Sequence, residues 1–373
     1  MLAPTRFLPH RRHRFKPAGS SRGFSITELL VVIGIIVLLA GLLLVALGKA
    51  RSRALETTTL STMQALARAC DTFQGDHGFY PGVIPERVLA EDPKITGTQN
   101  ALLHLLGGYR VLTPIEVDAA SGVAWDEFEQ FRSDSTSPVE SSGNEYLEFE
   151  APGGGTWRLV IDLDRIGEGP FINNRPYATY LSVSGNELRR IGMLDEDDVD
   201  IDDLLPHDRL PHLVDAWGQP IVYLRQIRTN GRLVGDATTT DSAERPQFTI
   251  QTARRYFNAT TLGDKALDQT QLCILSDEVA GGDEELINLN LAQLIRHPAF
   301  GPREVDDSSI RELTARGAYV LISAGADAVY FSRFDGAGRP GNPVDNIAED
   351  DGDYSAIPTI VSEYDDVVVF GGG

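Results

Sequence analysis

The chain has 373 residues, of which 42% are hydrophobic and 23% charged, and its formal net charge is −21. This composition is typical of a globular protein and excludes a disordered chain, a collagen-like repeat and a small disulfide scaffold. Residues 1–23 contain six basic and no acidic residues, so the rest of the chain carries −27, a charge that disfavours nucleic acid as a partner.

The first predicted element is a membrane-spanning helix. An uncharged run extends from Leu29 to Gly48, and its twenty residues span roughly 30 Å, which matches the hydrocarbon core of a bilayer. The run continues into the charged segment 49–53 rather than a small-residue cleavage site, so it does not resemble a signal peptide. The basic residues before it predict a single pass through a membrane, with a cytoplasmic amino terminus and the remainder on the outer side.

Glu28 lies just before the apolar run. An unpaired carboxylate carried to mid-bilayer would cost about 2.5 to 3.5 kcal/mol, so it requires a cationic partner. If a protease cut between Gly23 and Phe24, the new α-amine would lie four residues before Glu28. Glu28 of one copy could then neutralise Phe24 of the next copy and favour axial stacking.

Gly23, Phe24 and Glu28, together with the basic leader and the apolar helix, resemble the processing site of the type IV pilin and type II secretion pseudopilin family. The resemblance implies cleavage after Gly23 by a prepilin peptidase and N-methylation of Phe24. It also implies assembly with further copies and minor pseudopilins on an inner-membrane platform. The leader is long for the family, and Val45 stands where many members have proline. The alternative is an ordinary signal anchor with an incidental glutamate.

The helix is predicted to continue beyond the membrane, over residues 24–76 in all. Apolar residues then recur at steps of three or four, which predicts one face docked on a globular domain: Leu60, Met63, Ala67, Cys70 and Phe73. Gly75 and Gly78 are expected to end the helix. The sequence leaves open whether Cys70 pairs with Cys273, the other cysteine.

The remaining residues, 77–373, are expected to form a periplasmic head. The pattern predicts a helix over 98–106 that is capped by Gly107 and Gly108, and a strand over 157–163. A turn at 215–220 should feed a strand at 221–223, with Trp217 in the core. Two more strands are predicted over 318–323 and 367–370.

The last three strands resemble the carboxy-terminal sheet of a major pseudopilin. The resemblance covers roughly residues 20–106, 215–224 and 317–370, and the stretches 107–210 and 225–316 look like insertions. The expected fold is therefore α+β, a pilin-like lollipop whose long amino-terminal helix packs on a small antiparallel sheet, with a head enlarged by two insertions.

Acidic residues accumulate in the loop-like segment near the carboxyl end: Asp327, Asp335, Asp345, Asp350, Asp351, Asp353, Asp365 and Asp366. Ca²⁺ binds six to eight oxygens in a flexible cage, and a long loop between two strands can supply them. The resembled family binds a structural calcium here, which implies Asp327, Asp365 and Asp366 as ligands, followed by Asp351 and Asp353. A solvated acidic loop without an ion is the alternative. A zinc site at His207, Asp208, His212 and Asp215 is disfavoured because Pro206 and Pro211 interrupt a helix.

No catalytic motif is present, so a non-enzymatic subunit is expected. The favoured interpretation is a pseudopilin of a type II secretion system that assembles into a periplasmic pseudopilus and drives protein export. The alternatives are a type IV pilin for adhesion, motility or DNA uptake, and a membrane-tethered enzyme or binding module.

Overall fold

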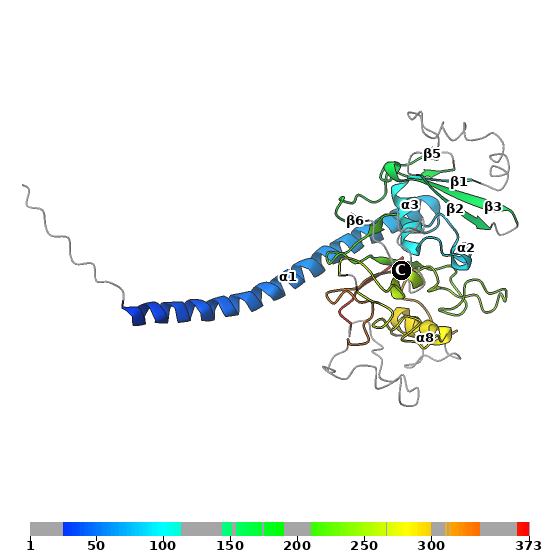
Figure 1. Cartoon of the computed structure of the whole chain (residues 1–373). Helices are drawn as coiled ribbons and strands as arrows, with labels where there is room; N and C mark the ends of the chain where they lie inside the picture. Colours follow the sequence, from blue (N-terminus) through cyan, green and yellow to red (C-terminus); the bar gives the residue numbers. More distant parts are fainter. Residues whose placement is uncertain are drawn as a thin grey trace, which may run out of the picture. The chain divides into compact units, whose positions relative to one another are not determined.

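The computed structural model describes residues 25–112, 144–150, 154–173, 175–189, 210–265, 267–299, 310–311, 313–335 and 364–372. The chain divides into two compact units, residues 1–51 and 52–373. The described residues form an α+β structure, with a long amino-terminal helix and small antiparallel sheets (Figure 1).

Helix α1 (Ile26–His77) is 52 residues long. It begins after Ser25, whose backbone N–H donates to Oε2 of Glu28 at 2.9 Å. It ends at Gly78, which has a φ of +81° and donates its N–H to the carbonyl of Gln74 at 2.7 Å. The expectation that Gly75 ends the helix is wrong, because α1 continues through Gly75 to His77. One glycine lowers the stability of a helix without ending it.

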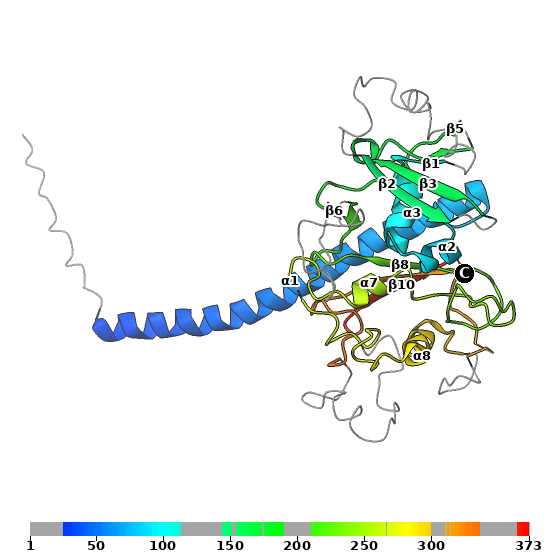
Figure 2. The same cartoon turned by 45° about the vertical axis from the view of Figure 1, so that its right-hand side comes forward.

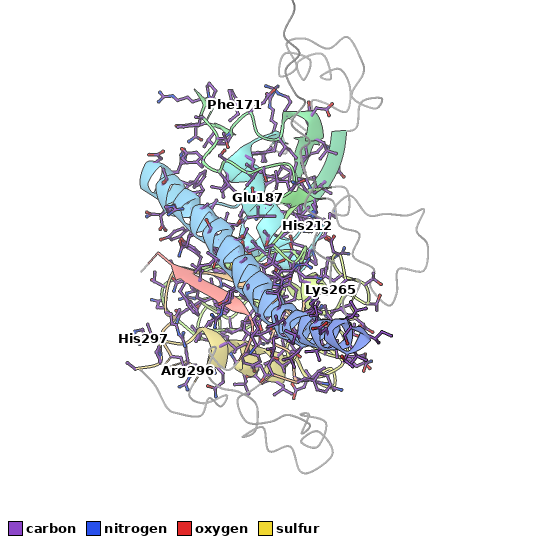
Figure 3. The ribbon with its side chains drawn as sticks, turned by 90° about the vertical axis from the view of Figure 1, so that its left-hand side faces the viewer. Phe171, Glu187, His212, Lys265, Arg296 and His297 are labelled. Carbon is purple, nitrogen blue, oxygen red and sulfur yellow. The ribbon has the colours of Figure 1, made fainter. Side chains whose placement is uncertain are left out.

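The two halves of α1 have different surroundings. In the first unit the described apolar side chains from Ile26 to Leu47 are exposed. In the second unit one stripe of the helix is buried, and its members are Met63, Leu66, Ala69, Cys70 and Phe73. The predicted face is confirmed at Met63, Cys70 and Phe73, while Ala67 is half-buried and the prediction is wrong for Leu60, which is 38% exposed. The packing begins with polar contacts, since the hydroxyl of Thr62 donates to Glu187 at 3.1 Å (Figure 3).

The buried stripe of α1 packs on a three-stranded antiparallel sheet in the order β10-β9-β8. Its strands are β8 (Val222–Arg225), β9 (Tyr319–Ser323) and β10 (Val367–Gly371). Ile322 in the central strand faces Val222 on one side and Val368 on the other. The three strands predicted from the carboxy-terminal pattern are therefore confirmed, and they pair with one another.

Both faces of this sheet are buried. Tyr223, Tyr319 and Leu321 pack on one face with α1. Alternate residues point to opposite faces of a strand, so Val222, Leu224, Val320 and Ile322 form the other face. That second face packs against a larger core that includes Phe248, Phe257 and Leu291, and these residues belong to the stretch predicted as an insertion.

This stretch contributes the short helix α7 (Arg254–Phe257) and the longer helix α8 (Glu284–Ile295), which Asp283 caps through its side chain. Figure 2 shows α8 on one side of strands β8 and β10 and strands β2 and β3 on the other. The stretch 225–316 therefore covers one face of the central sheet.

Helix α3 (Gly97–Leu106) confirms the predicted helix. Its start is a capping box: the backbone N–H of Gln99 donates to Oγ1 of Thr96, and the Gln99 side chain accepts from the Thr96 N–H. Gly107 and Gly108 come next with φ of +85° and +81°, as expected for a carboxy-terminal cap.

Helix α2 (Glu86–Glu91) is tied to β8 by an ion pair between Arg225 and Glu86 at 2.7 Å, whose side chains are 12% and 5% exposed. Arg225 also donates to the carbonyls of Tyr80 and Ile84, both at 3.0 Å, so the guanidinium holds the chain that connects α1 to α2.

A second antiparallel sheet, in the order β1-β3-β2, covers its own small core. It consists of β1 (Tyr109–Leu112), β2 (Asn144–Glu150) and β3 (Thr156–Asp162), and β3 confirms the strand predicted over 157–163. A 3₁₀ turn, η2 (Leu163–Arg165), comes directly after β3. The remaining strands form two short pairs: β4 (Phe171–Ile172) with β5 (Arg175–Pro176), and β6 (Leu188–Arg189) with β7 (His212–Leu213).

Trp217 is half-buried, so the expectation that it fills the core is wrong. Asp215, in the same turn, is buried, and its Oδ1 accepts from the N–H groups of Trp217 and Gln219 at 2.8 and 2.9 Å. Its Oδ2 accepts from the hydroxyl of Ser323 at 2.6 Å, which fixes the turn to the end of β9.

Candidate metal site and membrane helix

One described helix, α1, is long and apolar enough to span a membrane by length and composition. Glu28 lies at its start and is exposed, with one carboxylate oxygen bound to the N–H of Ser25. Gly23 and Phe24, the predicted processing residues, lie outside the described residues.

The structure brings three aspartates together where β9 and β10 meet. One oxygen from each of Asp327, Asp335 and Asp365 lies within 4.8 Å of the other two. Asp327 lies after β9 and Asp365 precedes β10, so antiparallel pairing of the two strands places both at the same end of the sheet.

Backbone N–H groups orient the cluster. Oδ2 of Asp365 accepts from the N–H groups of Ala326 and Asp327 at 3.1 and 3.0 Å. Oδ1 of Asp327 accepts from the N–H of Val329 at 2.8 Å. The turn after β9 approaches Asp365 closely at Gly325, which has a φ of +64° and where a Cβ would lie 2.4 Å from the carbonyl oxygen of Asp365.

Burial and neighbouring charge raise the pKa of two carboxylates of the cluster, those of Asp327 and Asp335. Burial, and then the charges of Asp365 and Asp335, raise the pKa of Asp327 to about 7 against the hydrogen bond from Val329. Burial and the charge of Asp365 raise the pKa of Asp335 to about 6. The side chain of the nearby Lys265 donates to the carbonyl of Ala326, not to a carboxylate (Figure 3). A divalent cation would favour the ionised form of all three acids.

The predicted ligands do not all lie in the cluster. Asp327 and Asp365 belong to it, and Asp335 completes it. The carboxylate of Asp366 instead accepts from the N–H of Phe331 at 3.0 and 3.1 Å. Asp351 and Asp353 lie outside the described residues. Asp335 was recognisable only as one acid of a long acidic segment, since nothing in its spacing marks it as a neighbour of Asp365.

His212 is fully buried and both ring nitrogens have protein partners (Figure 3). Nε2 lies 3.0 Å from the amide nitrogen of Gln99, and Nδ1 lies 3.1 Å from the hydroxyl of Tyr256. Burial lowers its pKa to about 3. The ring is therefore a neutral core group, and a zinc site at this histidine has no support in the described residues.

No family model, curated protein or solved structure matches the chain.

Proposed function

We propose that the chain is a membrane-anchored structural subunit of a pilin-like filament, and specifically a pseudopilin of a type II secretion system. The observation that carries the proposal is the division of α1. The described side chains from Leu29 to Leu47 are apolar and exposed, and one stripe of the second half packs on the head. A helix that exposes so many apolar side chains within its own unit requires either lipid or other copies of the same helix around it.

In this proposal the subunit waits in the inner membrane, is cleaved after Gly23 and is then extracted into a growing periplasmic filament. Glu28 pairs with the methylated amine of Phe24 of the neighbouring copy, so neither charge is left alone in an apolar surrounding. The filament pushes secreted proteins outward, and an assembly platform in the inner membrane supplies the movement.

Calcium is the proposed structural cofactor. Asp327, Asp335 and Asp365 offer three carboxylates oriented by backbone N–H groups, and carbonyl oxygens or water would complete the coordination of the ion. The ion would fix the turn after β9 to the start of β10, and so would hold the last strand of the chain in the sheet.

Mass spectrometry of the mature amino terminus tests the proposal. We expect a chain that begins with methylated Phe24, while a Gly23→Leu variant keeps its leader. An intact Met1 in the wild-type protein would refute the filament subunit. Cross-linking of the residue-24 amine to Glu28 of a second copy would support assembly directly.

The calcium proposal has its own test. The melting temperature of the protein should rise with calcium and fall in chelator, and an Asp335→Asn variant should lose most of this difference, because a ligand that binds only the folded state stabilises it. Equal melting temperatures with calcium and with chelator would refute the cofactor and leave the filament proposal standing.

A further inference from the structure

Strand β10 lies at one edge of the central sheet, whose order is β10-β9-β8. All residues of β10 are partly exposed, whereas every residue of β9 is buried. Exposed edge strands are commonly protected by a charged side chain, a proline or a bulge. The sequence of β10, Val-Val-Val-Phe-Gly, has neither charge nor proline, and its pairing with β9 runs without a bulge. The strand is therefore open to pairing with a further strand.

The opposite edge of the sheet shows which backbone groups of β10 point outward. In β8 the N–H of Tyr223 donates at 2.8 Å to Oγ1 of Thr98, a side chain of α3, instead of to β9. Backbone groups of successive residues point to opposite sides of an antiparallel strand. Leu321 lies opposite Tyr223 and therefore bonds to β10. Its partner in β10 is flanked by Val368 and Phe370, whose N–H and C=O groups consequently point away from the sheet.

The two edges differ in how their outward groups are satisfied. Thr98 closes the β8 edge, because its hydroxyl accepts from Tyr223 and donates to the carbonyl of Ile221 at 3.0 Å. Within the described ranges, no hydrogen bond reaches the outward groups of Val368 and Phe370. The β10 edge thus offers two donors and two acceptors at alternate residues, which is the pattern that an added strand uses.

A guanidinium at one end of the edge indicates the charge of the added strand. The guanidinium carbon of Arg316 lies 4.9 Å from the ring centroid of Phe370, and its Nε donates to the carbonyl of Arg296 at 3.0 Å (Figure 3). Burial, and then the charge of Arg296, lower the pKa of Arg316. Arg316 forms no ion pair with a described acid. This end of the edge therefore attracts a carboxylate, although the chain as a whole is acidic.

A second copy of the chain does not suit this edge. Antiparallel pairing of two β10 strands would relate the copies by a twofold axis normal to the sheet. The packed half of α1 lies on a face of that sheet, so the axis would point the two helices in opposite directions. Two copies whose helices enter the same membrane cannot pair in this way, and the added strand belongs to a different protein.

We propose that β10 binds an extended acidic segment of another protein, which adds a fourth strand to the central sheet, antiparallel to β10. The segment pairs its backbone with Val368 and Phe370 and places an acidic side chain beside Arg316. The inference goes beyond the filament proposal, since strand addition requires neither cleavage nor assembly.

Fluorescence anisotropy with the full-length protein in a neutral detergent tests the site. The probe is a labelled peptide, acetyl-Glu-Val-Thr-Val-Thr-Val-amide, whose glutamate comes to Arg316 when the peptide runs antiparallel to β10. The comparison peptide has lysine in place of the glutamate. We expect saturable binding that is about threefold tighter for the glutamate peptide, as for an exposed ion pair. The net charge of −21 would by itself favour the lysine peptide, so this order of affinities identifies the local site.

Two variants of one residue separate backbone from side chain. Val368→Pro removes an outward N–H without removing a hydrogen bond to β9, so it should abolish binding while the protein stays folded. Val368→Thr keeps this N–H and is the matched control, which should bind as the wild type does. Arg316→Gln should abolish the preference for glutamate over lysine.

Methylated peptides test the same pairing on the wild-type protein, independently of how the proline variant folds. Only alternate N–H groups of an added strand face β10, so N-methylation of alternate peptide residues should abolish binding in one phase and leave it intact in the other. Three results would overturn the proposal: no saturable binding by the wild type, equal effects of the two methylation phases, or tighter binding of the lysine peptide. Self-association of the wild type that Val368→Pro abolishes would also overturn it, since the edge would then belong to a second copy.

Discussion

Asp327, Asp335 and Asp365 meet although they are up to 38 positions apart, and within the described residues no basic side chain forms an ion pair with them. Like charges at this distance oppose their own ionisation. The cluster is therefore unfavourable at neutral pH without a cation, and its cost depends on pH.

Without calcium, the contribution of the aspartate cluster to stability should fall as the pH rises. The pKa of Asp327 is about 7 and that of Asp335 about 6, both above the usual value, so these two groups bind more protons in the folded state than in the unfolded state between about pH 4 and 7. The buried His212, with a pKa of about 3, acts in the opposite direction, so the contribution of the cluster is the difference between the wild type and Asp335→Asn. We expect Asp335→Asn to be more stabilising in chelator at pH 7.5 than at pH 5.5, as calorimetry would measure.

Calcium should reverse this dependence, because the ion favours the ionised acids that acid pH removes. The Asp335→Asn variant serves as the control and should show a weaker contribution of the cluster to the pH dependence in chelator. An identical pH dependence of the wild type and Asp335→Asn in chelator would contradict the prediction.

Gly325 is the second position where one residue decides the local structure. Alanine at a φ of +64° costs about 1 to 2 kcal/mol, and at Gly325 the added Cβ would also meet the carbonyl oxygen of Asp365 at 2.4 Å. Gly281 has the same φ of +64° with open space around it. Urea denaturation should show Gly325→Ala to be clearly more destabilising than Gly281→Ala, and equal losses would mean that the close approach is unimportant.

At the scale of elements, local sequence patterns predicted several helices and strands correctly. The 3.6-residue spacing of apolar positions identified the packed half of α1, and strand-like runs identified β3, β8, β9 and β10. The end of α3 at glycine was also predictable from the sequence, because the positive φ that often follows a helix strongly favours glycine.

Local patterns could not supply the long-range packing. The continuous apolar sequence of β9 does not say which segment covers its second face, and the structure places the stretch 225–316 there. Trp217 was expected in the core as a large aromatic side chain of a turn. The structure instead buries Asp215, whose carboxylate accepts hydrogen bonds from the backbone of the same turn. Asp335 was also not predictable from local patterns, because the path of the chain after β9 is what brings it to Asp365.

The packed half of α1 should carry much of the stability of the head. Met63 is fully buried and Leu60 is 38% exposed, although the two are neighbours on the same helix. Met63→Ala should cost about 2 to 5 kcal/mol of unfolding free energy, and Leu60→Ala less than about 1 kcal/mol. Urea denaturation monitored by tryptophan fluorescence would measure both, and similar losses would contradict the assignment of the docking face.

At the scale of the whole molecule, the exposed apolar run that begins at Leu29 is followed by a strongly acidic remainder. Acidic heads repel one another, so any assembly of many copies must be driven by the helices and by the neutralisation of charge within their apolar layer. Glu28 is the only charged residue between Phe24 and Gly48.

Glu28→Gln should therefore leave membrane insertion and leader cleavage intact and reduce sedimentable filaments by at least about tenfold, because the charge that fixes axial register is lost. Glu56→Gln, at an exposed acid further along α1, is the matched control and should assemble normally. Normal filament yield from the Glu28→Gln variant would remove charge pairing from the mechanism.

Because both faces of the central sheet are buried, the loss of packing on each face can be followed separately. Cys70 is a free, buried thiol in the layer between α1 and the sheet, and Cys273 is a free, buried thiol in the layer on the opposite face. Each layer thus contains one natural label site. The rates at which a thiol reagent modifies the two positions would report separately on the release of the helix and on the release of the stretch 225–316, without any engineered probe.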